Sequence, residues 1–336
     1  MNKVRLSIIG ATGTTYKRTI PALVNSDVCE VVAIQGRNLD KLKKIQGEYK
    51  IKDIYTDISA MLATAEYDCI YIGTPPFLHE AEIALAVSTL KPIICEKPFA
   101  IDYETGLRMS KLLTDYNDRT FMIAHHLRHQ KAISDTKTLI ESGKIGKLLN
   151  ASLQWGFEMN LEAPNAVWKL NPELGGKGTF SDNGIHVVDL AIHLFGVPSR
   201  ISGNILKIRS KETFDNETGF LIYDNDLCVQ LQSSQSMKFP GNHILIYGDK
   251  GSIEIFYGIG EKSISQIVVK TAEKQETIDY APTNLYGNEV ENFCRKLIDS
   301  SFQNVGTTLN EGLIALKIID TIRESSNSRS TINFTL

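Results

Sequence analysis

The sequence predicts an α/β protein of two domains: a doubly covered parallel sheet comes first, followed by an α+β domain on a mostly antiparallel open sheet. Three observations support this prediction. The chain has 336 residues, more than one hydrophobic core usually holds. Short apolar runs alternate with amphipathic stretches in the first third of the chain. Longer runs of alternating polarity, joined by turn residues, follow after it.

The first domain, residues 1–124, has the pattern of repeated βαβ units. Its strand candidates are nearly continuous apolar runs, as expected for strands that helices cover on both faces. They are residues 4–10, 30–36, 68–73, 92–96 and 120–124. Amphipathic stretches such as LDKLKKIQGEY (39–49) and HEAEIALAVSTL (79–90) lie between them. This alternation predicts a Rossmann-type domain, which binds ligands outside the carboxyl ends of its strands.

The second domain, residues 125–336, is expected to begin with a helix near 131–143. Strand candidates then follow at 148–159, 219–234 and 243–258. The stretches Asp224–Asp226 and Gly248–Gly251 are typical of hairpin turns and divide the last two candidates into strand pairs. Further helices are expected near 182–195, 287–299 and 309–325. We expect the functional site in the crevice between the two domains.

Composition narrows the class of protein. A net charge of −3 and a pI near 6.2 argue against a protein of nucleic acid or membrane surfaces, and no apolar run is long enough to span a bilayer. The opening apolar strand ends at Gly10, too soon for a signal peptide. The cysteines are odd in number, scattered and without metal-ligand spacing, so we expect reduced core thiols, no metal site and a cytoplasmic protein. They are Cys29, Cys69, Cys95, Cys228 and Cys294.

The loop IIGATGTTYKR (8–18) follows the first strand, where a dinucleotide-binding fold carries the pattern G-x-G-x-x-G. Gly10 holds the first glycine position, whereas Thr12 and Thr15 replace the second and third. The hydroxyl groups of these threonines, with the amides of Gly13 and Thr14 at a helix start, are expected to hold a pyrophosphate. The alternative is an ordinary tight turn between a strand and a helix.

The end of the second strand bears on the choice of cofactor. A fold that prefers NAD usually presents an acidic residue there to the ribose 2′-hydroxyl group. This chain has Gln35-Gly36-Arg37-Asn38, and the next carboxylate, Asp40, should already lie in a helix. Gly36 is expected to leave room for a 2′-phosphate and Arg37 to pair with it. This predicts NADP(H); if Arg37 stacks on adenine or points to solvent, NAD would be accepted equally.

The stretch ICEKPFA (94–100) places Glu96 and Lys97 at the carboxyl end of a buried strand. A lysine there could donate a hydrogen bond to a substrate hydroxyl group, or its pKa could be lowered by burial. The alternative is a surface lysine after a strand.

The stretch GGKGTFSDNGIHVVDLAIHLFG (175–196) contains Asp182 and His186, which share one face if both lie on one helix. Histidine titrates near neutral pH, which suits proton exchange with an alcohol. The alternatives are that Asp182 caps the helix and that His186 is a core histidine. We expect His193 to serve in packing and Asp189 to be structural.

Taken together, these stretches resemble the Gfo/Idh/MocA oxidoreductase family over nearly the whole chain. The resemblance rests on Gly10, Thr74-Pro75, Glu96-Lys97-Pro98 and Asp182-x-x-x-His186. Further matching stretches are GTPPFLHEAEIALA (73–86), the region of Arg128, ESGKIGKL (141–148), VWKLNPELGGKG (167–178) and NLYGNEVENF (284–293). The two threonines in the opening loop are the main departure from the family pattern.

The resemblance implies hydride transfer between a nicotinamide cofactor and the hydroxyl or keto group of a sugar, cyclitol or related compound. Lys97, Asp182 and His186 match the family's active-site lysine, partnered carboxylate and acid–base histidine. Thr74 and Pro75 match the lining of the nicotinamide ribose, with His79 and Glu96 beside them. Arg128, Trp168 and Lys169 match substrate-contacting positions; for Trp168 the alternative is a buried residue in a strand connection.

Two other functions stay open. The same fold can serve a non-catalytic, cofactor-binding regulator, or a reductase of a non-sugar substrate such as a dihydrodiol. The presence of both Lys97 and His186 favours an enzyme over a regulator. The resemblance also suggests a homodimer or homotetramer through the second sheet, at residues of about 200–280, because an open sheet leaves a face and edges that proteins cover.

Overall fold

The computed structural model describes residues 3–163, 166–256, 259 and 266–336. The chain divides into two compact units. The first unit comprises Met1–Ala100, Glu104–His126 and Asn284–Gly312, and the second comprises Ile101–Tyr103, Leu127–Thr283 and Leu313–Leu336. The division therefore differs from a single boundary at 124/125, because the chain returns to the first unit at Asn284.

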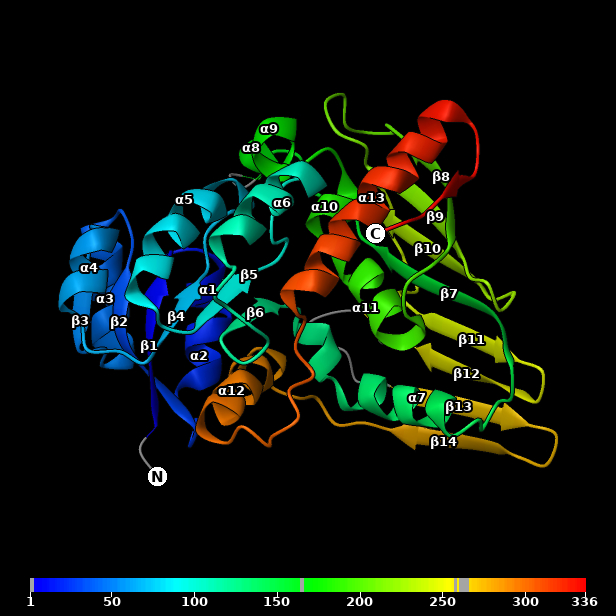
Figure 1. The fold of residues 1–336 in the computed structure, drawn as a ribbon, viewed down its shortest axis with the longest axis horizontal. Coiled ribbons are helices and arrows are strands. Elements are labelled where there is room, and N and C mark those ends of the chain that lie inside the picture. Colours follow the sequence, from blue (N-terminus) through cyan, green and yellow to red (C-terminus); the bar gives the residue numbers. More distant parts are fainter. Residues whose placement is uncertain (1–2, 164–165, 257–258, 260–265) are drawn as a thin grey trace. The chain divides into compact units, whose positions relative to one another are not determined.

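The first unit is built on a six-stranded parallel sheet with the strand order β3-β2-β1-β4-β5-β6 (Figure 1). Its strands are β1 (Val4–Ile9), β2 (Cys29–Gln35), β3 (Asp53–Tyr55), β4 (Cys69–Ile72), β5 (Ile93–Glu96) and β6 (Phe121–Ala124). Five of these strands were predicted. The sixth, β3, has three half-buried residues and no apolar run, so periodicity could not reveal it.

Helices cover both faces of this sheet. They are α1 (Thr14–Lys17), α2 (Thr19–Leu23), α3 (Leu39–Tyr49), α4 (Ile58–Thr64), α5 (Pro76–Ala86), η1 (Val87–Thr89), α6 (Tyr103–Leu112) and α12 (Leu285–Ile298). The short helix η2 (His126–His129) lies where the chain passes from the first unit to the second. Alternate strand residues such as Leu6, Ile8 and Tyr71 form one core with Ile20 of α2 and Phe293 of α12. The helix α12 thus completes a face of the first sheet, which explains why the chain returns to this unit.

The second unit contains a nine-stranded sheet with the order β14-β13-β12-β11-β7-β10-β9-β8-β15 (Figure 1). Its strands are β7 (Leu148–Gly156), β8 (Arg200–Leu206), β9 (Asn216–Ile222), β10 (Cys228–Ser234), β11 (Ile244–Gly248), β12 (Gly251–Phe256), β13 (Gln266–Thr271), β14 (Gln275–Asp279) and β15 (Ile332–Asn333). Among the described strands of this sheet, β7 and β10 pair in parallel and the other pairs are antiparallel, so the predicted mostly antiparallel sheet is confirmed. Both predicted hairpins form, between β9 and β10 and between β11 and β12. Residues 257–258, at the end of one predicted strand, lie outside the described residues.

The helices of the second unit are α7 (Lys131–Glu141), α8 (Ala166–Lys169), α9 (Pro172–Gly175), α10 (Thr179–Asp182), α11 (Ile185–Phe195) and α13 (Leu309–Ser328), whose first turn belongs to the first unit. The helix expected near 182–195 forms as α11, but it begins at Ile185. The chain breaks at Asn183-Gly184, where Gly184 approaches β10 so closely that a Cβ atom would lie 2.6 Å from Ser233. Asp182 therefore ends α10, and His186 lies on α11.

Candidate functional site

The turn after β1 requires glycine at its first position. Gly10 has φ +80°, and a Cβ atom there would lie 2.4 Å from Cγ2 of Thr74. The Gly10 amide donates to the backbone oxygen of Gln35 at 3.1 Å and faces its side-chain Oε1 at 3.3 Å. The ends of β1, β2 and β4 thus meet at Gly10, which is the close approach that a dinucleotide-binding turn needs.

Thr15 stands at the third glycine position of the motif, and the close approach of helix and strand there depends on Gly73. Thr15 is buried, and its hydroxyl group donates to the backbone oxygen of Gly73 at 3.3 Å. A Cβ atom on Gly73 would lie 2.2 Å from Thr15 Oγ1, so Gly73 now supplies the space between helix and strand. The expected pyrophosphate contact of the Thr15 hydroxyl is therefore wrong, since this group serves packing.

Thr12 likewise packs inside the unit. A Cβ atom on Gly36 would lie 2.9 Å from Thr12 Cγ2 and 3.3 Å from Leu42. Gly36 is buried and the half-buried Thr12 lies against it, so this close packing requires glycine. A 2′-phosphate site beside Gly36 stays a prediction. Arg37, in contrast, is exposed directly after Gly36, and Asp40 lies within α3 as predicted.

The helix start after this loop is short. The first helix, α1, has four residues and stops at Arg18, whose φ of −127° and ψ of −69° are not helical. A four-residue helix carries little of the macrodipole that favours phosphate at an N-terminus. Gly13 and Thr14 are exposed, and no atom lies within 4 Å of a Cβ atom built on Gly13. Their backbone amides are the accessible groups of this loop.

Two buried side chains organise the end of β4. Thr74 donates its hydroxyl group to the carboxyl group of Glu82, and burial raises the pKa of Glu82 to about 7. His79 is fully buried, and its two ring nitrogens lie 2.9 Å from the Thr74 oxygen and 3.1 Å from the Phe99 oxygen. Both nitrogens are thus engaged by backbone, which contradicts the expected cofactor contact. Pro75 is the N-cap residue of α5.

Glu96 and Lys97 follow at the end of β5, as predicted. The Glu96 carboxylate accepts a hydrogen bond from the hydroxyl group of Tyr71 at 2.7 Å and from the Lys97 amide at 3.1 Å. Tyr71 is fully buried, and its oxygen lies 3.3 Å from Thr19 Oγ1. Burial, the charge of Glu96 and that of Glu289 raise the pKa of Tyr71 well above its usual value, so Tyr71 is a permanent donor. Tyr71 was missed because a tyrosine in an apolar run is typical of any strand.

In the second unit, Asp182 and Lys169 form an ion pair. Lys169 Nζ lies 2.7 Å from Oδ1 and 2.8 Å from Oδ2 of Asp182, and the two side chains are 19% and 11% exposed. The same ammonium group lies 5.6 Å from the ring centre of Trp168, which is half-buried on α8 rather than in a strand connection. Asp182 is not a helix cap, because the N-cap residue of α11 is Gly184. Two predicted site residues are thus brought together.

His186 is 1% exposed and stacks on Trp155 of β7, with ring centres 5.0 Å apart and planes at 22°. Burial by itself fits both an acid–base role and a packed core histidine. Trp155 was missed, since an aromatic residue in a strand carries no specific signal.

Arg128 differs from its expected role at the substrate. It is 2% exposed, and its Nε donates to Asp189 Oδ2 at 2.8 Å. Asp189 is buried on α11, so this pair attaches α11 to the segment before α7. Asp189 is structural, as expected, and Arg128 is its counter-ion.

The short helix α10, which carries Asp182, is held by a second buried ion pair. Arg323 Nε donates to Glu217 Oε1 at 2.9 Å, and its Nη2 donates to Ser181 Oγ at 3.0 Å. Glu217 Oε2 accepts the amide hydrogen of Phe180 at 2.6 Å. Both ions are thus connected to the helix that ends at Asp182.

Within the described part of the chain, no group of three or more metal-ligating side chains occurs, and no helix is long and apolar enough to cross a membrane. The five cysteines are free, four of them buried and Cys228 half-buried, as predicted. A surface depression of about 1130 Å³ is lined by residues that include Arg5, Asp68 and Pro92, at the amino ends of the parallel strands, away from Gly10 and Lys97.

Comparison with known proteins identifies the family. Residues 4–125 match the oxidoreductase family with an NAD-binding Rossmann fold, and residues 133–254 match the GFO/IDH/MocA C-terminal domain. The chain belongs to the Gfo/Idh/MocA oxidoreductase family. This confirms the predicted fold, the predicted family and the oxidoreductase class.

Individual family members are distant in sequence. A D-xylose 1-dehydrogenase [NADP(+)] of Haloarcula marismortui is 24% identical over 98% of this chain and 93% of its own. A D-apiose dehydrogenase of Rhizobium rhizogenes is 27% identical over 68% of this chain and 66% of its own. The solved structure of an aldose-aldose oxidoreductase from Caulobacter crescentus, complexed with glycerol, has a TM-score of 0.89 at 20% identity and covers 99% of this chain and all of its own.

Proposed function

We propose that this protein is an NADP(H)-dependent dehydrogenase that moves a hydride between the cofactor and a hydroxyl or keto carbon of a sugar or related compound. The observation that carries the proposal is the carboxylate of Asp182: it caps no helix, is nearly buried and is paired with Lys169, just before the helix that bears His186. A largely buried ion pair is weak evidence for stability, and Asp182 lies four residues before His186 in the chain, so a chemical role is favoured.

The first unit fits a dinucleotide. Gly10 brings the strand ends together, the amides of Gly13 and Thr14 are exposed, and Arg37 is exposed after β2. We propose that these residues, rather than Thr15 or His79, hold the cofactor. Arg37 would pair with a 2′-phosphate, which favours NADP(H) over NAD. The similar D-xylose 1-dehydrogenase [NADP(+)] of Haloarcula marismortui supports this choice.

The proposed chemistry needs few protein groups. When bound, the nicotinamide supplies the acceptor or donor of the hydride. In the oxidation direction, His186 takes the proton of the substrate hydroxyl group while the electron pair of the carbon–hydrogen bond leaves with the hydride. Lys97 would donate a hydrogen bond to the same oxygen and stabilise its developing negative charge. Asp182 balances the positive charge of Lys169. Reduction runs through the same steps in reverse.

Substrate class and assembly are part of the proposal. The relatives act on xylose and apiose, as their names state, so neutral aldoses are the first candidates. We propose a homodimer or homotetramer through the open face of the second sheet, where Phe220 and Tyr247 are 38% and 43% exposed. Residues 257–258 and 260–265 of that proposed interface lie outside the described residues. The free thiols fit the cytoplasm, the location that we propose.

The experiment that tests this function follows absorbance at the nicotinamide band after mixing NADP⁺ with D-xylose and a panel of aldoses, and NADPH with the matching keto compounds. Lys97→Met and His186→Ala are each expected to lower turnover by roughly a hundredfold or more, with NADPH affinity nearly unchanged. NADPH binding without turnover of any sugar by the wild type would favour the regulator or a non-sugar substrate. Normal turnover in either variant would remove its residue from the mechanism.

A further inference from the structure

We propose that Gln235 is a positioning residue of the reaction, which holds the carboxylate of Asp182 in place against Lys169. The catalytic part of this inference rests on the proposed function. Gln235 Nε2 donates to Asp182 Oδ2 at 3.0 Å, so this oxygen accepts from both Gln235 and Lys169, at 2.8 Å, while Oδ1 accepts from Lys169 at 2.7 Å. Gln235 is 5% exposed, and its neutral amide donates a hydrogen bond without adding a charge.

The backbone of Gln235 is fixed on both sides. Its amide donates to the backbone oxygen of Asp215 at 2.8 Å, and its carbonyl oxygen accepts from the amide of Met159 at 2.9 Å. These two bonds place residue 235 directly after β10, between the segment after β7 and the loop before β9. A fixed backbone limits the rotamers of the Gln235 side chain, so its amide group is held in the direction of Asp182.

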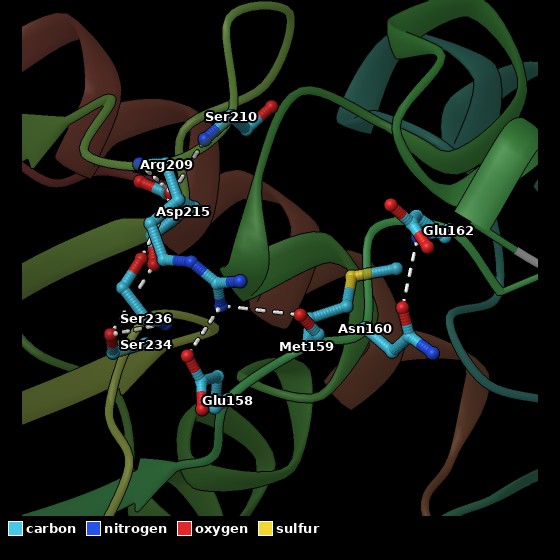
Figure 2. Close-up of polar contacts among 9 residues, drawn as sticks. All are labelled: Glu158, Met159, Asn160, Glu162, Arg209, Ser210, Asp215, Ser234 and Ser236. Carbon is cyan, nitrogen blue, oxygen red and sulfur yellow. Dashed lines mark hydrogen bonds and ion pairs between the residues drawn. The ribbon is translucent and has the colours of Figure 1, made fainter.

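Asp215 organises the loop that supplies one of these bonds (Figure 2). Its carboxylate accepts the amide hydrogens of Ile208, Arg209 and Ser210 at 2.6, 2.6 and 2.8 Å, and the hydroxyl hydrogen of Ser236 at 2.9 Å. Burial alone would raise the pKa of Asp215, but these donors lower it overall, so the group stays ionised. We call Asp215 with these four donors the Asp215 clasp.

The clasp also reaches the segment that supplies the other bond. In Figure 2 the side chain of Arg209 extends from the clasp to the segment after β7. Its Nη1 donates to the Met159 oxygen at 3.2 Å and lies 3.4 Å from Glu158 Oε1. Asp215 and Met159, the two backbone partners of Gln235, are therefore tied to each other through Arg209. This explains why a loop with no catalytic residue of its own is so fully hydrogen-bonded.

The substitution Gln235→Glu tests whether this amide really faces Asp182. It replaces a donor by a carboxyl group of nearly the same shape, within hydrogen-bond distance of the Asp182 carboxylate. Two carboxyl groups that close share one proton, so the pKa of one is raised well above its ordinary value. At low pH the shared proton restores the lost hydrogen bond, whereas at high pH the two charges repel each other. The charged groups nearby are Lys169, which offsets part of the repulsion, and Asp215, Arg209 and Glu158, which are bound to one another or to backbone.

We expect two results for Gln235→Glu relative to the wild type. Turnover should be within about threefold at pH 5.5 and at least about tenfold lower at pH 8. The midpoint of thermal unfolding should fall further below that of the wild type as the pH rises. A carboxyl group whose pKa is raised in the folded protein destabilises the fold at pH values above its pKa in the unfolded chain, which is about 4.3. NADPH affinity should not change, since Gly10 and Arg37 are untouched.

Two matched variants complete the test. Gln235→Met removes the donor without adding a carboxyl group, so it should lower turnover about equally at both pH values. Gln275→Glu makes the same substitution as the test variant at an exposed site on β14 and should leave both quantities at wild-type values. The proposal would be overturned if Gln235→Glu showed no loss of turnover and unfolding midpoint, or a loss that did not depend on pH. Full turnover in Gln235→Met would also overturn it.

The unfolding measurement needs no substrate, so the two proposals can fail separately. If no sugar is turned over but the unfolding midpoint of Gln235→Glu depends on pH as expected, the contact with Asp182 is supported and the proposed function fails. If sugars are turned over and the pH dependence is missing, the proposed function stands and the positioning role fails.

Discussion

Glu217→Gln should destabilise the second unit strongly, because it breaks a buried ion pair from one side. The side chains of Glu217 and Arg323 are 0% and 7% exposed, and their closest atoms, Oε1 and Nε, lie 2.9 Å apart. The substitution removes the closer anion of the buried Arg323 guanidinium and leaves Asp320, whose Oδ1 lies 3.7 Å from Nη1 and whose side chain is 34% exposed. It also weakens the acceptor for the Phe180 amide at the start of α10.

The magnitude follows from the burial of both ions. Removing one partner of a buried pair costs about 3–5 kcal/mol of unfolding free energy, since the remaining charge stays in a medium of low polarity. For a cooperative unit of about 150–250 residues, each kcal/mol lowers the unfolding midpoint by roughly 2–4 °C, so we expect a decrease of about 6–20 °C. Turnover should fall as well, because α10 ends at Asp182.

Thermal unfolding followed by circular dichroism measures this effect. Glu276→Gln is the matched control: its pair with Lys274 has a 2.6 Å contact but is 42% and 54% exposed, so the loss should be at most about 1 kcal/mol. A double variant, Glu217→Leu with Arg323→Met, should recover much of the stability because it removes both charges. If Glu217→Gln unfolded at the same temperature as the control, the reasoning from burial would be refuted.

Three other predictions concern the cofactor, the pH dependence and the assembly. Arg37→Ala should weaken NADPH binding at least about tenfold and leave NADH binding unchanged, as measured by fluorescence titration. If the variant and the wild type bound NADPH with equal affinity, Arg37 would have no part in the choice of cofactor. Burial raises the pKa of Glu82 to about 7, so the free energy of unfolding of the wild type falls as the pH rises from about 4.5 through 7. The stability of Glu82→Gln relative to the wild type, measured by urea unfolding, should therefore increase by up to about 3 kcal/mol between pH 5 and 8. A stability difference that does not depend on pH would contradict this. Light scattering should show a dimer or tetramer that Phe220→Glu dissociates, and a wild-type monomer at micromolar concentration would exclude the proposed interface.

The sequence by itself determined the class of the fold and the place of the main motifs. Buried strands of a parallel sheet are apolar on both faces, so runs such as residues 30–36 and 92–96 were visible without tertiary information. The positions of Glu96 and Lys97 at a strand end followed from the same pattern. Asp40 could be placed inside a helix because α3 has a strong apolar periodicity and Asn38 caps it.

Only the tertiary structure decided what these side chains contact. Thr15 and Thr12 were expected at the pyrophosphate, yet they pack against Gly73 and Gly36, because the space left by a glycine depends on a strand far away in the chain. Asp182 and His186 lie on separate helices because Gly184 approaches Ser233, a contact between residues about fifty positions apart. The pairs Arg128–Asp189 and Gln235–Asp182 also join residues that are more than fifty positions apart in the chain. Local periodicity reports which face of an element is buried, whereas the partner of a polar side chain is set by long-range packing, on which the sequence carries no local signal.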